Sequence, residues 1–349
     1  MHNFPHQIYA SGWYQVGWSA ELPPGGVAPM RYFDQELVCY RGHDGTVLVS
    51  DAFCPHLGAH LGYGGKVEGD CITCPMHGWT WGPDGQNVAI PYSRPDRMEL
   101  SIRHWPVAEV DGLVLLWFGA HGEEPTWGPP RFLPEDASLS EDFWDLHPAC
   151  TGEWRGVRFP PQVVTENSCD AAHFRYVHGA AEVPDIVGCD SGDHWFETRF
   201  TLRFGGGVPS TWATPKGPVD GTLTTTAYGL GLAAGRLGGF DTVYTLASTT
   251  PVSFETSDHR ATVWVPRRRG DGSPLDETIR DRWAGEQRVQ HARDVPIWEN
   301  MTYVDKPAFA RSEAQTFRAL RRWIERHYSE AAGNVPAADA VSTAVAVGS

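Results

Sequence analysis

Two short stretches of this 349-residue sequence follow one plan: CPHLGAH at residues 54–60 and CPMHGW at residues 74–79. Each contains a cysteine, a proline directly after it, a histidine within three residues of the cysteine, and then a glycine. The full pattern is C-x-H, seventeen residues at positions 57–73, and then C-x-x-H. Two thiolates and two imidazoles in this pattern predict a metal site formed by Cys54, His56, Cys74 and His77.

Two kinds of metal centre fit these four side chains. Structural zinc also uses two Cys and two His, and Cys71 adds a C-x-x-C spacing with Cys74 that zinc sites favour. A Rieske [2Fe–2S] cluster needs two Cys on one iron and two His on the other. Each stretch offers one of each from a glycine-containing loop, and the narrow C-x-H spacing favours the cluster. Cys71 is then predicted to be an ordinary strand residue before the second loop.

The first third of the chain is predicted to be an all-β unit. Apolar segments flank three Asp-Gly pairs, at 44–45, 84–85 and 111–112, and Asp-Gly between such segments is a strong hairpin signal. A stretch rich in proline and glycine follows at residues 121–137. The sequence therefore predicts a first domain at residues 1–120.

The remainder mixes strand and helix patterns. Residues 241–250 and 259–268 have the β-branched content and alternation of strands. Residues 273–294 are predicted to form a helix capped by Ser273 with Pro274 in its first turn. The fold class is therefore α+β, with a second domain at residues 121–330.

A second helix is predicted at residues 312–328, where Ser312 and Gln315 have the spacing of a capping box. Its apolar residues recur on one face, as expected for a helix that packs on a core. The last residues, 331–349, are small and unpatterned, and they are predicted to be a flexible tail.

Composition excludes several functions. The chain carries 28 Lys and Arg against 43 Asp and Glu, a formal charge of −15, which argues against a nucleic-acid partner. No run reaches the length of about 18 apolar residues that a membrane helix needs. The N-terminus lacks a basic segment followed by an apolar one, and the seven cysteines lack the spacing of a disulfide framework. We therefore expect a cytoplasmic protein with no membrane span.

The first third resembles the Rieske domain of the Rieske non-haem iron oxygenases. The resemblance spans roughly residues 10–118 and includes GDCITCPMHGWTWGPDGQ at 69–86. It implies Cys54 and Cys74 on the buried iron, with His56 and His77 on the outer one. Respiratory Rieske proteins also link the two loops by a disulfide, whereas this chain has Ala59 and Met76 there. That difference implies a lower potential, suited to electrons from NADH.

A second motif lies in ENSCDAAHFRYVHGA at residues 166–180. Asp170, His173 and His178 form D-x-x-H-x-x-x-x-H. Two histidines five residues apart point about 140° apart on an ideal helix, so they converge only at a widened turn or a helix end. Gly179 directly after His178 is a plausible helix stop. Two His and one carboxylate make the facial triad that holds non-haem Fe(II).

This motif is similar to the catalytic domain of the same oxygenases, where both histidines bind iron. The resemblance implies a third ligand far along the chain, and Asp294 in DVPIWEN (294–300) is our assignment, because this segment resembles the ligand-bearing segment of the 3-ketosteroid 9α-hydroxylases. The rival carboxylates are Asp281, Glu299 and Asp305. In the family the aspartate corresponding to Asp170 is not a ligand but connects the iron site to the cluster.

The resemblance implies a helix-grip catalytic domain with an antiparallel sheet and long helices. It also implies a terminal oxygenase that uses NAD(P)H-derived electrons and O2, with hydroxylation as the leading reaction and desaturation, O- or N-demethylation or ring dihydroxylation as alternatives. The motifs most resemble the ketosteroid 9α-hydroxylase and cholesterol 7-desaturase branch, which suggests a bulky, apolar, steroid-like substrate.

The family also implies partners. They are a separate flavin reductase or ferredoxin, and a homotrimer in which the cluster of one subunit serves the iron of the next. A docking surface is expected near His56 and His77, with Lys66, Arg94 and Arg97. The rival class is a Rieske electron carrier that is not an enzyme. The glycine-rich stretch at 227–239 is predicted to be either surface loop or pocket lid.

Overall fold

The computed structural model describes residues 4–204, 217–239 and 241–332, and the chain forms two compact units. The N-terminal unit is Tyr14–Pro129. The C-terminal unit contains the chain from Pro130 onward together with the segment that ends at Trp13. None of the helices in the described ranges has the length and apolar character needed to cross a bilayer.

The two units do not have the domain limits expected from the sequence, 1–120 and 121–330. The segment before Tyr14 groups with the C-terminal unit because Phe4, Ile8 and Ala10 pack into a core cluster of α5 (Ala314–Ala331). The stretch after residue 120 groups with the N-terminal unit. There Trp117 donates a hydrogen bond to the carbonyl of Glu123 and its ring packs edge-on against Trp127.

The N-terminal unit is built from short antiparallel strands, as predicted. Its sheets have the strand orders β1-β11-β10, β2-β3-β4-β9 and β5-β6-β7-β8. The three Asp-Gly pairs lie in the β3–β4, β7–β8 and β10–β11 turns. Asp111 and Gly112 both have positive φ, 52° and 85°, which is the type I′ turn that suits a twisted hairpin. The elements are β1 (Gly12–Trp18), η1 (Ser19–Glu21), β2 (Val27–Tyr32), β3 (Gln35–Arg41), β4 (Val47–Asp51), β5 (Lys66–Glu68), β6 (Cys71–Thr73), β7 (Thr80–Trp81), β8 (Asn87–Ala89), β9 (His104–Trp105), β10 (Val107–Val110) and β11 (Leu113–Phe118).

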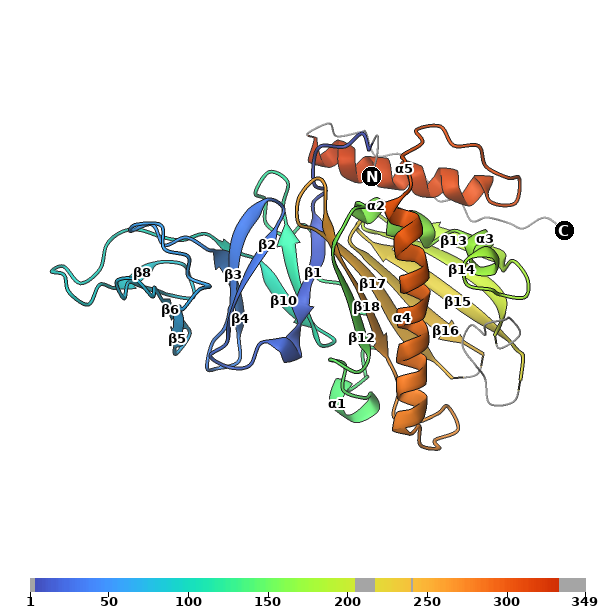
Figure 1. The fold of residues 1–349 in the computed structure, drawn as a ribbon, viewed down its shortest axis with the longest axis horizontal. Coiled ribbons are helices and arrows are strands. Elements are labelled where there is room, and N and C mark those ends of the chain that lie inside the picture. Colours follow the sequence, from blue (N-terminus) through green and yellow to red (C-terminus); the bar gives the residue numbers. More distant parts are fainter. Residues whose placement is uncertain (1–3, 205–216, 240, 333–349) are drawn as a thin grey trace. The chain divides into compact units, whose positions relative to one another are not determined.

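The C-terminal unit is one antiparallel sheet with helices packed on it (Figure 1). The strand order is β12-β18-β17-β16-β15-β14-β13, and α4 packs against β12 and β18. Trp283 and Ala284 of α4 share a core cluster with Phe200, Leu223 and Val263 of the sheet. The elements are α1 (Leu139–Asp142), β12 (Thr151–Val157), α2 (Pro161–Asn167), α3 (Ala171–Tyr176), β13 (Asp185–Ser191), β14 (Trp195–Phe204), β15 (Val219–Tyr228), β16 (Leu232–Gly238), β17 (Val243–Pro251), β18 (Ser257–Trp264), α4 (Glu277–Glu299) and α5. The predicted α+β class with an antiparallel sheet and two long helices is confirmed.

Both long helices begin later than the sequence signals indicated. The predicted cap at Ser273 is wrong: α4 begins at Glu277, because the carboxylate of Asp276 accepts a hydrogen bond from the amide of Ile279. The helix also continues past residue 294 to Glu299. Pro296 lies inside it, and burial of Val295 and Trp298 stabilises this last turn.

The capping box predicted at Ser312 and Gln315 is also wrong. Helix α5 begins at Ala314, and the side chain of Glu313 instead accepts a hydrogen bond from the amide of Ala310, which tightens the preceding turn. The tail predicted from residue 331 lies outside the described residues from 333 onward.

Candidate functional site

The two Cys/His stretches form loops with the same backbone hydrogen bonds. In the first, the amide of Cys54 donates to the carbonyl five residues later at 2.9 Å, and the amide of Gly58 donates back to Cys54 at 2.9 Å. The second repeats both bonds around Cys74 and Gly78, at 2.8 and 3.0 Å. Both glycines have positive φ, 76° and 71°, which other residues rarely adopt. The two loops therefore differ chiefly in the histidine, which stands one position later in the second.

The four predicted cluster ligands lie in these two loops of the N-terminal unit. Cys54 and Cys74 are buried. Burial is the main cause that raises the pKa of the Cys54 thiol, and the neighbouring Cys74 raises it further. The rings of His56 and His77 lie 4.7 Å apart between centroids. His56 stacks on Trp79 at 4.5 Å, and its Nδ1 is buried with no hydrogen-bond partner among the described residues.

The donor set fits a Rieske cluster. A buried pair of thiols needs a cation to become thiolates, and an unpartnered buried imidazole nitrogen is available to bind one. Cys71 begins strand β6 and pairs with Glu68 in the ladder, as predicted for a strand residue.

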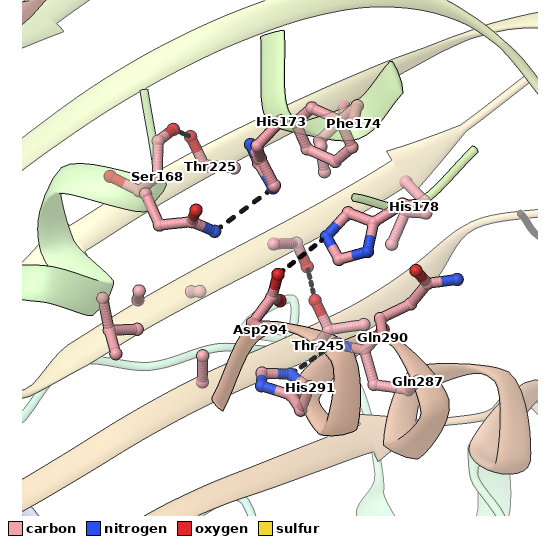
Figure 2. Close-up of a pocket in the computed structure, with 18 of the residues that line it drawn as sticks. Ser168, His173, Phe174, His178, Thr225, Thr245, Gln287, Gln290, His291 and Asp294 are labelled. Atoms are coloured by element: carbon pink, nitrogen blue, oxygen red, sulfur yellow. Dashed lines mark hydrogen bonds and ion pairs between the residues drawn. The ribbon is translucent and has the colours of Figure 1, made fainter. Parts of the chain in front are cut away.

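The C-terminal unit brings together the second predicted set around a cavity. The cavity has a volume of about 140 Å³ and is partly open to solvent. His173 comes from α3, His178 from the turn after it and Asp294 from α4, and Figure 2 shows His178 and Asp294 facing each other with His173 above them. The rival carboxylates Asp281, Glu299 and Asp305 do not line it.

Helix α3 ends at Tyr176, and the chain then turns so that both histidines reach the cavity. The amides of Val177 and His178 both donate to the carbonyl of His173, at 2.8 and 3.4 Å, and Gly179 follows with φ 77°. The second of these bonds spans five residues, which is the widened turn that the spacing required. The ring centroids of His173 and His178 lie 4.9 Å apart.

His173 is held in the tautomer that a metal ligand needs. Its Nδ1 donates to the carbonyl oxygen of Asp170 at 2.5 Å, so Nε2 carries the lone pair. The side-chain amide of Asn167 lies 3.2 Å from that Nε2 and can donate to it. The N–H of Asn167 thus points at the lone pair of His173 that a metal cation would bind.

His178 and Asp294 face each other as neutral groups. Nε2 of His178 lies 3.4 Å from Oδ1 of Asp294. Burial lowers the pKa of His178 to about 3 and raises the pKa of Asp294 to about 8, so this contact is not an ion pair near neutral pH. Metal binding would therefore displace the proton of Asp294. Nδ1 of His178 has no hydrogen-bond partner among the described residues.

Within the described ranges, no three His, Cys, Asp or Glu side chains already meet at metal-binding distances. The fit of iron here rests on the pairwise contacts, the free Nε2 of His173 and the chemistry of two imidazoles and one carboxylate.

Asp170 caps helix α3. Its Oδ1 accepts hydrogen bonds from the amides of Ala172 at 3.0 Å and His173 at 3.2 Å. Both bonds use Oδ1, so Oδ2 remains able to accept another donor. Burial is the main cause that raises the pKa of Asp294, and the nearby Asp170 raises it further. The two carboxylates are therefore close enough to interact electrostatically.

The polar residues of the cavity that were not predicted as site residues from the sequence include Asn167, Gln287, Gln290 and His291. On α4 the last three share a helix face with Asp294, at the i, i+3, i+4 and i+7 spacing. That polar stripe is the sequence signal that could have identified them. The glycine-rich stretch at 227–239 contains strand β16, whose Ala233, Ala234 and Leu237 form a wall of the cavity.

Comparison with known protein families gives two matches. Residues 12–108 match the Rieske [2Fe-2S] domain, and residues 116–328, more than half of the chain, match the 3-ketosteroid 9alpha-hydroxylase C-terminal domain. The chain belongs to the Rieske oxygenases. Membership brings the two cofactors of this family, a Rieske [2Fe–2S] cluster and a non-haem iron.

Similar proteins include both hydroxylating and desaturating enzymes. The oxygenase is 30% identical to cholesterol 7-desaturase of Bombyx mori, over 92% of this chain and 70% of the relative. It is 28% identical to the probable oxygenase component of 3-ketosteroid-9-alpha-monooxygenase of Rhodococcus rhodochrous, over 93% and 81%. Against cholesterol 7-desaturase of Xenopus laevis the identity is 40%, but the match spans only 49% of this chain and 36% of the relative.

The fold also matches solved Rieske oxygenase structures. The apo structure of dicamba monooxygenase aligns over 95% of this chain and 100% of that one, with a TM-score of 0.66 and 20% identity. At this identity the likeness supports the fold alone.

Replacement of either His178 or Asp294 by Ala should remove the mononuclear iron and leave the cluster spectrum intact, because the two metal sites use separate side chains from separate units. Iron analysis together with visible and EPR spectra would measure both sites in one preparation. The matched control is Asp281→Ala, an exposed carboxylate of α4 paired with Arg280. Full iron content in Asp294→Ala would show that another group is the ligand.

Proposed function

We propose that this Rieske oxygenase is the terminal component of a multi-component system that hydroxylates a bulky, mostly apolar, steroid-like substrate. The observation that carries the proposal is the cavity in which the predicted iron ligands lie beside an extended apolar wall. Its apolar lining comes from α2, α3, α4 and strands β14 to β17: Val164, Phe174, Ala180, Leu202, Phe204, Leu223, Ala233, Ala234, Leu237, Ala247 and Trp298.

The cavity is suited to a neutral substrate. None of the described residues that line it is Lys or Arg, so it offers no cationic side chain to a carboxylate or phosphate. Its volume of about 140 Å³ is smaller than a steroid skeleton, which would therefore extend through the open side of the cavity. Apolar walls exclude water from the reacting carbon, and binding there gains free energy from burial of the substrate skeleton.

The protein residues divide into groups that hold metals and groups that hold the substrate. Cys54, His56, Cys74 and His77 would hold the cluster, and His173, His178 and Asp294 would hold the mononuclear iron. When bound, the cluster supplies electrons and the iron activates O2. The carbonyl of Asp170 keeps His173 in its ligating tautomer, as described above.

Desaturation is the second candidate reaction, because the similar proteins include cholesterol 7-desaturases as well as a 3-ketosteroid monooxygenase component. O- or N-demethylation and ring dihydroxylation are further alternatives in the same family. A Rieske electron carrier without enzymatic activity would leave the second cavity and its iron ligands unexplained.

We also propose the partners that the family implies. Electrons would come from NAD(P)H through a flavin reductase, a ferredoxin or both. Lys66, Arg94 and Arg97 are exposed on the N-terminal unit and would contribute to docking of that partner. The seven cysteines are all free, which suits a reducing compartment such as the cytoplasm.

The assembly would be a homotrimer in which the cluster of one subunit serves the iron of the next. Head-to-tail contacts close into such rings when the rotation allows it. Asp170 would then connect the two metals. Its Oδ1 would keep its hydrogen bonds to the amides of α3, and its Oδ2 would be available to a cluster histidine of the neighbouring subunit.

Incubation of the iron-replete oxygenase with a surrogate reductase, NADH and steroids under ¹⁸O2 tests the proposed reaction. Hydroxylation should place one labelled oxygen atom in the product. A product with one more double bond and no label would assign desaturation instead. If no steroid stimulates NADH oxidation or is converted by the reconstituted system, the proposed substrate class is wrong.

Asp170→Asn should slow electron transfer from the reduced cluster to the iron site by orders of magnitude while both metals stay bound. The amide oxygen can still cap α3, but the charge that couples the two sites is lost. Rapid mixing of the reduced protein with O2 and substrate would measure cluster reoxidation. A wild-type rate in this variant would contradict the role of Asp170, and Glu166→Gln is a matched nearby control.

A further inference from the structure

Helix α4 forms a polar end of the cavity, and further polar side chains from α2, α3 and the strands line it elsewhere. Gln287, Gln290 and His291 face the same space as Asp294, whereas the strands opposite contribute mainly apolar side chains (Figure 2). Polar groups inside an apolar cavity lower the affinity for hydrocarbon unless a ligand pairs with them. The chemistry of this end therefore indicates which polar group the substrate carries.

A buried chain of hydrogen bonds holds this polar end in place. Nε2 of Gln287 lies 3.0 Å from Nε2 of His291, and Nδ1 of His291 lies 2.8 Å from Nε2 of His259 on β18. Nδ1 of His259 in turn lies 2.9 Å from Oγ1 of Thr249 on β17. Thr249, His259 and His291 are all buried, so the chain reaches from the sheet to the cavity wall.

Both imidazoles of this chain are neutral. Burial lowers the pKa of His291 to about 4 and holds the pKa of His259 well below its usual value. Each ring therefore carries a single N–H, and each bond of the chain has one defined donor.

The contact with Gln287 gives the chain its direction. Nε2 of the Gln287 amide can only donate, so Nε2 of His291 accepts and the N–H of His291 lies on Nδ1. His291 then donates from Nδ1 to Nε2 of His259, whose own N–H lies on Nδ1. A hydrogen bond from the ring of His259 to the backbone of Ser248 agrees with this direction.

The Gln287 amide has two N–H groups. One N–H is used by His291, so the second N–H is left for a partner in the cavity. A substrate oxygen could accept that hydrogen bond without any rearrangement of the chain.

Gln290 adds the complementary group. Its Oε1 is buried and has no hydrogen-bond partner among the described residues. A buried acceptor without a donor is destabilising, and a ligand that donates an O–H to it would remove that cost. A hydroxyl group can donate to Oε1 of Gln290, whereas a ketone oxygen can only accept.

We infer that Gln290, with Gln287 on the same face of α4, forms a subsite that binds a hydroxyl group of an otherwise apolar polycyclic substrate. His291, His259 and Thr249 are positioning residues, which together hold the Gln287 amide. The inference rests on the proposed function, and it selects alcohols over the ketones of the same skeleton.

Equilibrium binding of one alcohol and its ketone tests the subsite. The probes are 5α-cholestan-3β-ol and 5α-cholestan-3-one, delivered in cyclodextrin to the anaerobic, iron-replete protein and followed by calorimetry. The alcohol should bind roughly 5- to 10-fold more tightly, the ratio expected for one additional hydrogen bond. Gln290→Leu should remove this preference by weakening the alcohol alone, and Gln315→Leu, on the exposed face of α5, should leave both affinities unchanged.

The other outcomes separate the inference from the proposed function. Equal affinity of the two probes for the wild-type protein overturns the hydroxyl subsite but leaves a steroid-binding cavity. Binding of neither probe contradicts the steroid-like substrate class and the subsite with it. The oxygen of Gln290 could instead accept a hydrogen bond from Nδ1 of His178, which also has no partner among the described residues. If Gln290→Leu lowers the iron content and leaves the preference for the alcohol unchanged, Gln290 orients that ligand and the inference is wrong.

Discussion

The site depends on the way α3 ends. In a continuous helix, residues five apart point about 140° from each other, so His173 and His178 could not serve one metal. The chain stops the helix at Tyr176, lets the amides of Val177 and His178 share the carbonyl of His173, and leaves through Gly179 at positive φ. This single turn brings the second imidazole back to the cavity, where α4 places Asp294 within 3.4 Å of it.

At the other end of α3, Asp170 has two structural roles that do not depend on any role in electron transfer. Its carboxylate caps α3 and so fixes where the helix begins, and its carbonyl accepts from Nδ1 of His173 and so fixes the ring. Burial keeps His178, in the turn after α3, and His291, on α4, neutral, so these polar groups of the cavity offer lone pairs and single N–H donors and no positive charge. A neutral polar end beside an apolar wall suits an apolar substrate with one oxygen function.

Local patterns predicted a large part of this arrangement. The Cys/His loops could be recognised because their ligands and their glycines lie within five residues of each other, and the Asp-Gly hairpins because a turn depends on its own residues. Helix starts were less predictable, since Asp276 caps α4 in place of Ser273 and Glu313 closes a turn before α5. Several good capping residues stood close together, and tertiary packing decided among them.

The cavity wall could not be derived from the sequence. Gly235 lies in β16 where an added Cβ would meet Oγ1 of Thr245 at 2.5 Å, so the glycine is needed for strand packing and does not mark a loop. His291 has its partner His259 thirty-two residues earlier, on a different element. Only the order of strands in the sheet brings such residues together.

The central claim is that the cavity between α3, α4 and the sheet holds a mononuclear iron. Anomalous diffraction from crystals of the iron-replete protein, recorded on both sides of the iron absorption edge, tests it most directly. The account predicts an iron peak bounded by His173, His178 and Asp294, separate from the peak of the cluster at Cys54, His56, Cys74 and His77. An active preparation with the cluster peak and no iron between His173, His178 and Asp294 would contradict it.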